Sequence, residues 1–211
     1  MSGRRERQKQ DREARILRVA AQLFAAKGYA GTSLQQIAER AHLAVGTIYN
    51  YFPSKPEIIL AVVEGDTAAG LRAGEQVLKR PPSDPVKAVQ VLLEKVIAPF
   101  AAHDRALWRE LVGAALSDRV IGGGFFASDV RVIALLAALL RELQARGDVR
   151  ADLDADRAAV ALYGVFFAWF MAYLASDALT LDTVRAELRT GVRLVMHGLL
   201  ERAPNEGEET S

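Results

Sequence analysis

The chain has 211 residues, of which 51% are hydrophobic and 25% are charged. That length and balance exclude a disordered or fibrous protein and allow one large or two modest domains with buried cores. Cysteine is absent and the first ten residues hold no apolar run of the signal-peptide type, so a disulfide scaffold is excluded and a cytoplasmic protein is expected.

The net charge of +1 is divided unevenly along the chain. Residues 1–56 hold 10 Lys and Arg against 4 Asp and Glu, a net charge of +6, whereas the remainder holds 17 against 22, a net charge of −5. A basic N-terminal quarter on an acidic body indicates that one end of the molecule meets a polyanion. For residues 1–10, which are expected to form a mobile basic arm, a solvated tail is the alternative.

Three helices are predicted in the N-terminal part. The first begins at Asp11 and ends where Gly28 supplies a C-terminal stop. Apolar residues then recur at helical spacing within residues 34–41, after a cap at Thr32 or Ser33, and again within residues 45–52. In the second set the spacing places Tyr49 and Phe52 on the apolar face and Tyr51 on the opposite one. Two short helices joined by a tight turn predict a helix-turn-helix motif over residues 11–56.

The second helix of such a motif enters the major groove, so its outward residues should be small and polar. Gly46, Thr47 and Asn50 meet that requirement, because Asn pairs with adenine, Thr contacts a base edge and Gly lets the backbone approach. Phosphate contacts are expected from the side chains of Tyr49, Tyr51 and Lys55. The alternative is an ordinary helical hairpin with its polar residues in solvent.

Four segments carry a resemblance to a known family: I-L-R-V-A-A-Q-L-F-A-A-K-G-Y (16–29), T-S-L-Q-Q-I-A (32–38), G-T-I-Y-N-Y-F (46–52) and S-K (54–55). They resemble the DNA-binding domain of the TetR family of transcriptional repressors. The resemblance implies an all-helical homodimer whose C-terminal domain binds a small effector and thereby releases DNA. The DNA-binding residues expected from the motif and the resemblance are Ser33, Gln35, Val45, Gly46, Thr47, Tyr49, Asn50, Tyr51 and Lys55.

Two residues depart from the family pattern. His42 stands where the family mostly has Gly, at a cost of about 1 kcal/mol if the backbone there is left-handed. Ala44 stands where the family mostly has Ser, which forfeits a helix cap worth about 0.5 to 2 kcal/mol. Both departures concern the stability of the motif and leave its identity intact.

The rest of the chain is predicted to be helical, which gives an all-α fold of about nine helices. A capping box at Ser54 opens a long bridging helix to about Leu78, and further helices are expected over 85–102, 104–117, 128–144 and 181–201. Asp84 and Ser128 are the expected caps of the first and third of these, and Asp152 or Asp154 is the expected cap of a helix that contains residues 158–175. The run Gly122 to Gly124 is the expected flexible point. Residues 57–202 thus form a helical-bundle domain for ligand binding and dimerisation, and residues 203–211 form a disordered tail.

The stretch from Ala158 to Ala175 has no charged residue, so a membrane span is an alternative. Its Asp-rich flanks and central Trp169 favour a buried helix instead. Burial against a second subunit would cover such a helix on all sides. The last helix offers a matching stripe for a four-helix dimer interface: Leu188, Val192, Val195, Met196 and Leu199.

No catalytic constellation is present, because Cys is absent and the three His are isolated, so neither an enzyme, a cofactor nor a metal site is expected. Aromatic residues of the body either fill the core or line a pocket for a mainly apolar effector such as a fatty acyl or aromatic compound. Arg105, Arg109 or His103 would meet its polar end. The expected ligand-binding residues are Phe100, His103, Trp108, Arg109, Phe125, Phe126, Phe166, Phe167, Phe170 and Tyr173.

The sequence therefore predicts a ligand-responsive dimeric repressor that binds a pseudo-palindromic operator in double-stranded DNA. One alternative is a helix-turn-helix protein whose body only dimerises. The other, of a different class, is an all-helical enzyme or lipid-binding protein without sequence-specific DNA binding.

Overall fold

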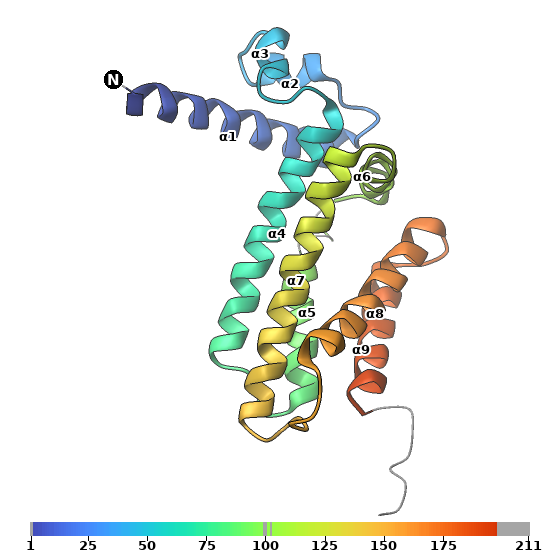
Figure 1. Ribbon diagram of the computed structural model, residues 1–211. Helices are drawn as coiled ribbons and strands as arrows, with labels where there is room; N and C mark the ends of the chain where they lie inside the picture. Colours follow the sequence, from blue (N-terminus) through green and yellow to red (C-terminus); the bar gives the residue numbers. More distant parts are fainter. Residues whose placement is uncertain (1, 99–100, 102, 198–211) are drawn as a thin grey trace, which may run out of the picture.

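The computed structural model describes residues 2–98, 101 and 103–197, with the side chains of residues 2 and 3 left aside. Over this part the chain forms nine helices and no strand, so the predicted all-α class is confirmed (Figure 1). The helices are α1 (Ser2–Lys27), α2 (Leu34–Arg40), α3 (Val45–Tyr49), α4 (Lys55–Lys79), α5 (Pro85–Ile97), α6 (Arg105–Ser117), α7 (Arg119–Ala145), α8 (Ala155–Ala175) and α9 (Leu181–His197).

One end of the molecule holds α1, α2 and α3, which pack with the beginning of α4 around fully buried apolar side chains. Ile16, Ile37, Ile48 and Ile58 are all 0% exposed there, one from each of the four helices. Burial of each such side chain stabilises the fold by about 1.5 to 3 kcal/mol. This small core fixes the helix-turn-helix relative to the long helix that leaves it.

Helix α1 begins at Ser2, earlier than the predicted start at Asp11. Residues 4–10 are exposed and make the helix project from the body (Figure 1). These residues are mostly Arg, Glu, Gln and Lys, which have high helix propensity and include no Pro. Once residues 11–27 nucleate the helix, each added residue gains a hydrogen bond, so the segment predicted as an arm continues the helix.

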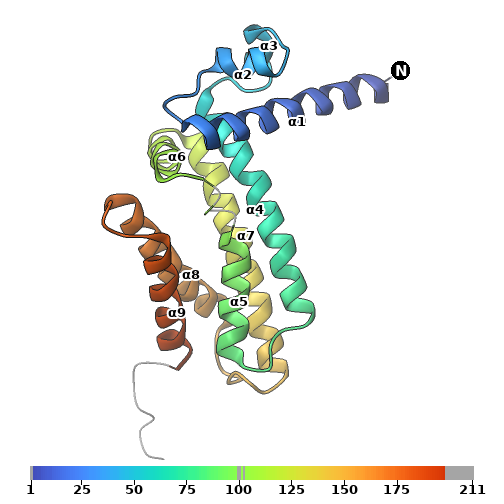
Figure 2. The same ribbon diagram turned by 180° about the vertical axis from the view of Figure 1, so that it is seen from behind.

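The body consists of two groups of helices. Helices α4, α5 and α7 lie side by side along its length, and α8 and α9 form a second group that packs against them (Figures 1 and 2). Two glycines allow close approaches: a Cβ added at Gly70 would lie 2.6 Å from the carbonyl oxygen of Val96, and one at Gly191 would lie 2.4 Å from Cγ1 of Val165. Helix α4 is therefore closely packed against α5.

The prediction for the glycine run was wrong, because Gly122 to Gly124 lie inside α7. Asp118 caps this helix, its Oδ1 accepting hydrogen bonds from the N–H groups of Val120 and Ile121, and Ser128 lies within it. Glycine inside a helix costs about 1 kcal/mol relative to Ala. At two of the three positions the absent side chain makes room, since a Cβ at Gly122 would lie 2.4 Å from the carbonyl oxygen of Ala115 and one at Gly124 would lie 2.8 Å from Cδ2 of Leu60. Packing thus outweighs propensity.

Helices α7 and α8 are long and apolar enough to cross a membrane by length and composition alone. Both are packed among other helices: α7 contacts α4, α6 and α8, and α8 contacts α9 as well. Such contacts are typical of core helices in a helical protein. They favour a buried helix over a membrane span for residues 158–175.

The predicted dimer stripe of α9 is largely used inside the subunit. Leu188 and Val192 are buried against neighbouring helices of the same chain, at 3% and 0% exposed. Val195, at 39% exposed, stays outward, whereas Met196 is half-buried. The apolar face of α9 packs on α5 and α8 of the same subunit, because these neighbouring helices also expose apolar side chains toward it. Leu199, the predicted end of this helix at 201 and the tail 203–211 lie outside the described residues.

Candidate nucleic-acid interface and effector cavities

The turn between α2 and α3 depends on one residue with left-handed backbone. His42 has φ 53°, the one positive value outside glycine in the described part of the chain. The N–H of Leu43 donates to the carbonyl oxygen of Ala38 at 2.9 Å, and that of His42 donates to Glu39 at 3.1 Å. This pair of bonds is the Schellman motif, which needs a left-handed residue where His42 stands. The strain inferred for His42 is therefore present.

Helix α2 opens with a complete capping box. The Ser33 hydroxyl oxygen accepts from the N–H of Gln36 at 3.2 Å, and the Gln36 side chain accepts from the N–H of Ser33 at 3.1 Å. Gln35 is exposed beside it, and its amide donates to Glu39 at 3.3 Å. Of the two predicted caps, Thr32 and Ser33, the structure uses Ser33, which leaves Gln35 on the outer face.

Helix α3 is a single exposed turn held by one buried side chain, Ile48. Gly46 and Asn50 are exposed and Thr47 is half-buried, as is Val45. The side chains of Thr47 and Asn50 make no hydrogen bond to any described residue. Their donors and acceptors are free to meet a ligand at this surface.

Tyr49 and Tyr51 have the opposite exposure to the one that helical spacing predicts. Tyr49 was placed on the apolar face but is 52% exposed, whereas Tyr51 was placed outward but is half-buried against the core. The reason is that α3 ends at Tyr49 with Asn50 as its C-cap, so residue 51 no longer follows the helical period. Phe52, beyond the turn, is buried as predicted.

Lys55, at the start of α4, is tied to the protein backbone. Its Nζ donates to the carbonyl oxygens of Tyr29 at 2.7 Å and Thr32 at 2.8 Å, and it lies 3.7 Å from the centroid of the Tyr29 ring. Burial lowers the pKa of this lysine, and the carboxylate of Glu110 opposes that shift. Lys55 thus links the bridging helix to the turn between α1 and α2, a role that the sequence did not indicate.

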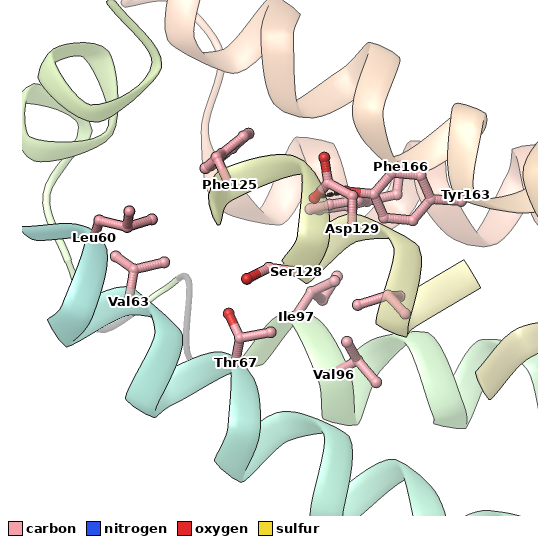
Figure 3. Close-up of a pocket in the computed structure, with 11 residues that line it drawn as sticks. Leu60, Val63, Thr67, Val96, Ile97, Phe125, Ser128, Asp129, Tyr163 and Phe166 are labelled. Atoms are coloured by element: carbon pink, nitrogen blue, oxygen red, sulfur yellow. Dashed lines mark hydrogen bonds between the residues drawn. The ribbon is translucent and has the colours of Figure 1, made fainter. Parts of the chain in front are cut away.

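The body has an inner and an outer cavity. The inner cavity lies between α4, α5, α7 and α8 and is narrow, with a volume of about 10 Å³ (Figure 3). The outer cavity lies between α5, α6, α8 and α9 and has a volume of about 300 Å³. Of the two, the outer cavity has room for a ligand without movement.

Some predicted ligand residues line these cavities and others do not. Trp108, Phe170 and Tyr173 line the outer cavity, Phe125 lines the inner one, and Phe166 lines both. By contrast, Phe126 is 65% exposed and Phe167 is 38% exposed, and neither lines either cavity. Helical spacing explains the division, because adjacent aromatic residues of one helix point to different sides. Phe100 lies outside the described residues.

The polar residues predicted to meet the effector are engaged elsewhere. Arg109 donates to the carbonyl oxygen of Leu174 at 2.6 Å, and Arg105 donates to that of Ser176 at 2.7 Å, so both satisfy the C-terminal end of α8. His103 pairs with Asp66 of α4, Nε2 to Oδ2, at 2.6 Å. None of the three lines a cavity.

Other polar residues line the cavities, and sequence reasoning did not single them out as ligand-binding residues. Arg185 and Arg189 of α9 line the outer cavity, as does Glu94, whose carboxylate lies 3.7 Å from Arg189. In the inner cavity the hydroxyl of Tyr163 donates to Asp129, whose pKa is raised by burial. The one signal available was a carboxylate, Asp129, close to the aromatic pair Phe125 and Phe126.

Residues 16–62 match a family model described as bacterial regulatory proteins, tetR family. The solved structure of FadR from Thermus thermophilus, a TetR-family transcriptional repressor in complex with lauroyl-CoA, superposes with a TM-score of 0.73 at 26% identity, over 92% of this chain and 97% of that one. Residues 16–62 thus form a TetR-family N-terminal domain, and the whole chain has the fold of a TetR-family regulator.

Two curated TetR-like relatives differ in how much of the chain they match. The transcriptional regulator EthR of Mycolicibacterium smegmatis is 30% identical over 93 residues, which are 44% of this chain and 43% of that protein. UidR of Escherichia coli is 22% identical over 147 residues, 69% of this chain and 72% of that protein. The match to EthR thus spans less than half of that relative.

In this TetR-family domain, Ala44 occupies the N-cap of α3 and forms no side-chain cap. Replacing Ala44 with Ser is expected to stabilise the domain by about 0.5 to 2 kcal/mol, because the hydroxyl can accept from an unpaired N–H of the first turn. Its backbone is already extended, with φ −71° and ψ 146°, as a cap requires. Thermal and urea unfolding of Ala44→Ser against wild type measure the gain, and Ala44→Val, which cannot cap, should show none.

Since the Lys55 ammonium is bonded to backbone carbonyls, replacing Lys55 should affect the stability of the domain more than its contacts with DNA phosphates. The Lys55→Met variant keeps the apolar stem but loses both hydrogen bonds, so we expect a lower unfolding temperature. A lost phosphate contact reduces the slope of log DNA affinity against log salt concentration by about one. Because the ammonium of Lys55 faces the protein, we expect Lys55→Met to change this slope by less than that. Lys27→Met, at the exposed end of α1, is the control, and a full unit of slope change in Lys55→Met would establish a phosphate contact.

The cluster at the end of α8 predicts a pH dependence of stability. Hydrogen bonds from Arg109 and Arg105 hold the pKa of Asp177 below its ordinary value. A carboxylate with a lowered pKa in the folded state stabilises the fold above the unfolded pKa, and that contribution disappears as pH falls through the folded value. Asp177 is 82% exposed, so solvent screens the effect. Unfolding temperatures of Asp177→Asn and wild type should differ at neutral pH and converge in acid.

Proposed function

We propose that the protein is a cytoplasmic, ligand-responsive transcriptional repressor that binds a pseudo-palindromic operator as a homodimer and leaves it when a mainly apolar effector binds. The observation that carries the proposal is the exposed turn of α3, where Thr47 and Asn50 present unpaired polar groups on a helix anchored by Ile48. Major-groove readout needs this combination of a fixed helix and free side chains.

The charge around α3 supports binding to a phosphate backbone. Helix α1 projects from the same end of the molecule and exposes a run of basic residues in its first half (Figure 1). These are Arg4, Arg5, Arg7, Lys9 and Arg12. Cations at this place add sequence-independent affinity for DNA and a dependence on salt.

An exposed apolar surface on α8 and α9 supports dimerisation. Val160 and Phe167 of α8 and Leu194 and Val195 of α9 are each between 38% and 56% exposed. A second copy related by two-fold symmetry would bury them. Sedimentation of Phe167→Glu tests this: a monomer at concentrations where wild type is a dimer supports the interface, and an unchanged dimer contradicts it.

The outer cavity supports an effector with an apolar body and an anionic group. Its aromatic wall includes Trp108 and Phe170, and its edge includes Arg185 and Arg189. A FadR from Thermus thermophilus binds lauroyl-CoA and one from Bacillus subtilis binds stearoyl-CoA. We propose an acyl-CoA thioester as the effector, with the arginines pairing with its phosphates.

The test begins by selecting sequences that the purified protein retains from randomised double-stranded DNA. A recovered pseudo-palindrome, bound in excess random DNA, supports the regulator. No sequence preference would instead favour an all-helical enzyme or lipid-binding protein. Addition of lauroyl-CoA, lauric acid or free CoA to the protein–operator complex then separates the effector classes, because only lauroyl-CoA should release the DNA.

A further inference from the structure

The two cavities share a wall. Phe166 and Ile97 line both of them, so the inner cavity begins where the outer one ends. The helices around them differ in one respect: α4 contributes Leu60, Val63 and Thr67 to the inner cavity and nothing to the outer one. Helix α4 is also the helix that leads to the DNA-binding domain. A ligand confined to the outer cavity therefore does not touch it.

We propose that Phe166 is a gate between the cavities, and that an acyl effector weakens DNA binding only when its chain passes Phe166 into the inner cavity. Short acyl groups then bind without effect, and long ones act as inducers. This inference rests on the proposed function and adds the element that converts binding into release.

The inner cavity is too narrow to fill without displacing its walls. Its volume is only about 10 Å³, so an alkyl chain must displace side chains that line it, among them Leu60 and Val63 of α4 (Figure 3). Packed interiors resist such expansion and transmit it to neighbouring elements. Ligand-driven change requires contacts that differ between two states, and only the inner cavity supplies them at α4.

The lining of the inner cavity suits an alkyl chain. Most of its walls are aliphatic or aromatic, including Val96 and Val132. Its carboxylate, Asp129, already accepts a hydrogen bond from Tyr163, so those two polar groups satisfy each other (Figure 3). This bond also holds Tyr163 in place one helical turn from Phe166, and the Phe166 ring, 5.7 Å from that of Tyr163, is the aromatic ring that lines both cavities.

Phe166 has a counterpart that provides a matched control. Its ring lies 5.6 Å from that of Phe170, one turn further along α8, and the two rings are stacked. Both side chains are about equally buried, at 4% and 5% exposed, but Phe170 lines only the outer cavity. Truncation at either position removes the same atoms from α8, and Phe166→Ala alone opens the wall that the two cavities share. The two rings also have different neighbours, since Phe170 packs edge-on against Trp108 and Phe166 is tilted against Tyr163.

The experiment compares butyryl-, octanoyl-, lauroyl- and stearoyl-CoA by two measurements. Calorimetry gives the affinity of each thioester for the protein, and fluorescence anisotropy gives operator affinity with the thioester at saturation. For wild type we expect butyryl-CoA to bind without changing operator affinity, and lauroyl-CoA to lower it by about fivefold or more. Phe166→Ala should allow a shorter chain to release DNA, whereas Phe170→Ala should leave the chain-length threshold unchanged.

A second variant fills the inner cavity with a larger side chain on α7. Val132→Phe should retain butyryl-CoA binding and lose release by lauroyl-CoA, because Val132 lines only the inner cavity. The inference is overturned if butyryl-CoA releases DNA as well as lauroyl-CoA does, or if Phe166→Ala and Phe170→Ala share one threshold. Absence of binding by every thioester to wild type refutes the proposed effector class, and the gate with it.

Discussion

Replacing Asn50 with Ala is expected to weaken binding to the selected operator by about 1 to 3 kcal/mol, while binding to random DNA stays nearly unchanged. The amide of Asn50 is exposed and forms no hydrogen bond to a described residue, so its loss leaves the fold intact. The donor and acceptor of the Asn50 amide match the edge of adenine in the major groove. In Asn50→Ala that base edge would be buried without its hydrogen-bond partner, which lowers the affinity for the operator. Thr47→Ala should show the same selective loss, at a different base pair.

Anisotropy titrations of both variants with operator, with operators changed at one base pair and with random DNA measure this selectivity. Wild type should lose affinity when the contacted base pair is changed, and Asn50→Ala should no longer distinguish the two sequences. Tyr49→Phe is a control for the exposed surface of the same turn, since it removes only a hydroxyl. Equal losses on operator and random DNA would show that Asn50 does not read a base.

Operator DNA is expected to weaken effector binding by the same factor by which the effector weakens DNA binding, about 5- to 150-fold or 1 to 3 kcal/mol. The link is α4, which is tied to the α1–α2 turn through Lys55 and lines the inner cavity through Thr67. In the proposed dimer, a tilt of α4 in each subunit would alter the distance between the two α3 helices. That distance must be about 34 to 36 Å, or a multiple, for successive major grooves.

Calorimetric titration of lauroyl-CoA into the protein, with and without saturating operator, measures this coupling without any structural assumption. Random DNA of the same length is the control, since it forms no specific complex. An effector affinity that operator leaves unchanged would exclude coupling through α4 for that ligand, even if both ligands bind.

The sequence by itself determined the all-α class, the helix-turn-helix and most helix ends. Ser33, Asp84 and Asp154 cap their helices as the residue pattern indicated, and Gly28 ends the first helix with φ +71°. The caps and the glycine stop depend on residues within one or two turns of each other, so local chemistry suffices to predict them. The strained turn at His42 and the missing cap at Ala44 were expected from departures from the family pattern, and the structure contains both.

Only the tertiary structure decided which side chains meet across the chain. Lys55 looked free for phosphate, yet the carbonyls of Tyr29 and Thr32, more than 20 residues away, take its ammonium. Arg109 and His103 looked free for an effector but pair with α8 and α4. A polar side chain binds whatever partner packing brings within reach, and that partner cannot be inferred from spacing along one helix. The division of the body into two cavities at Phe166 has the same origin, because it requires four helices to meet.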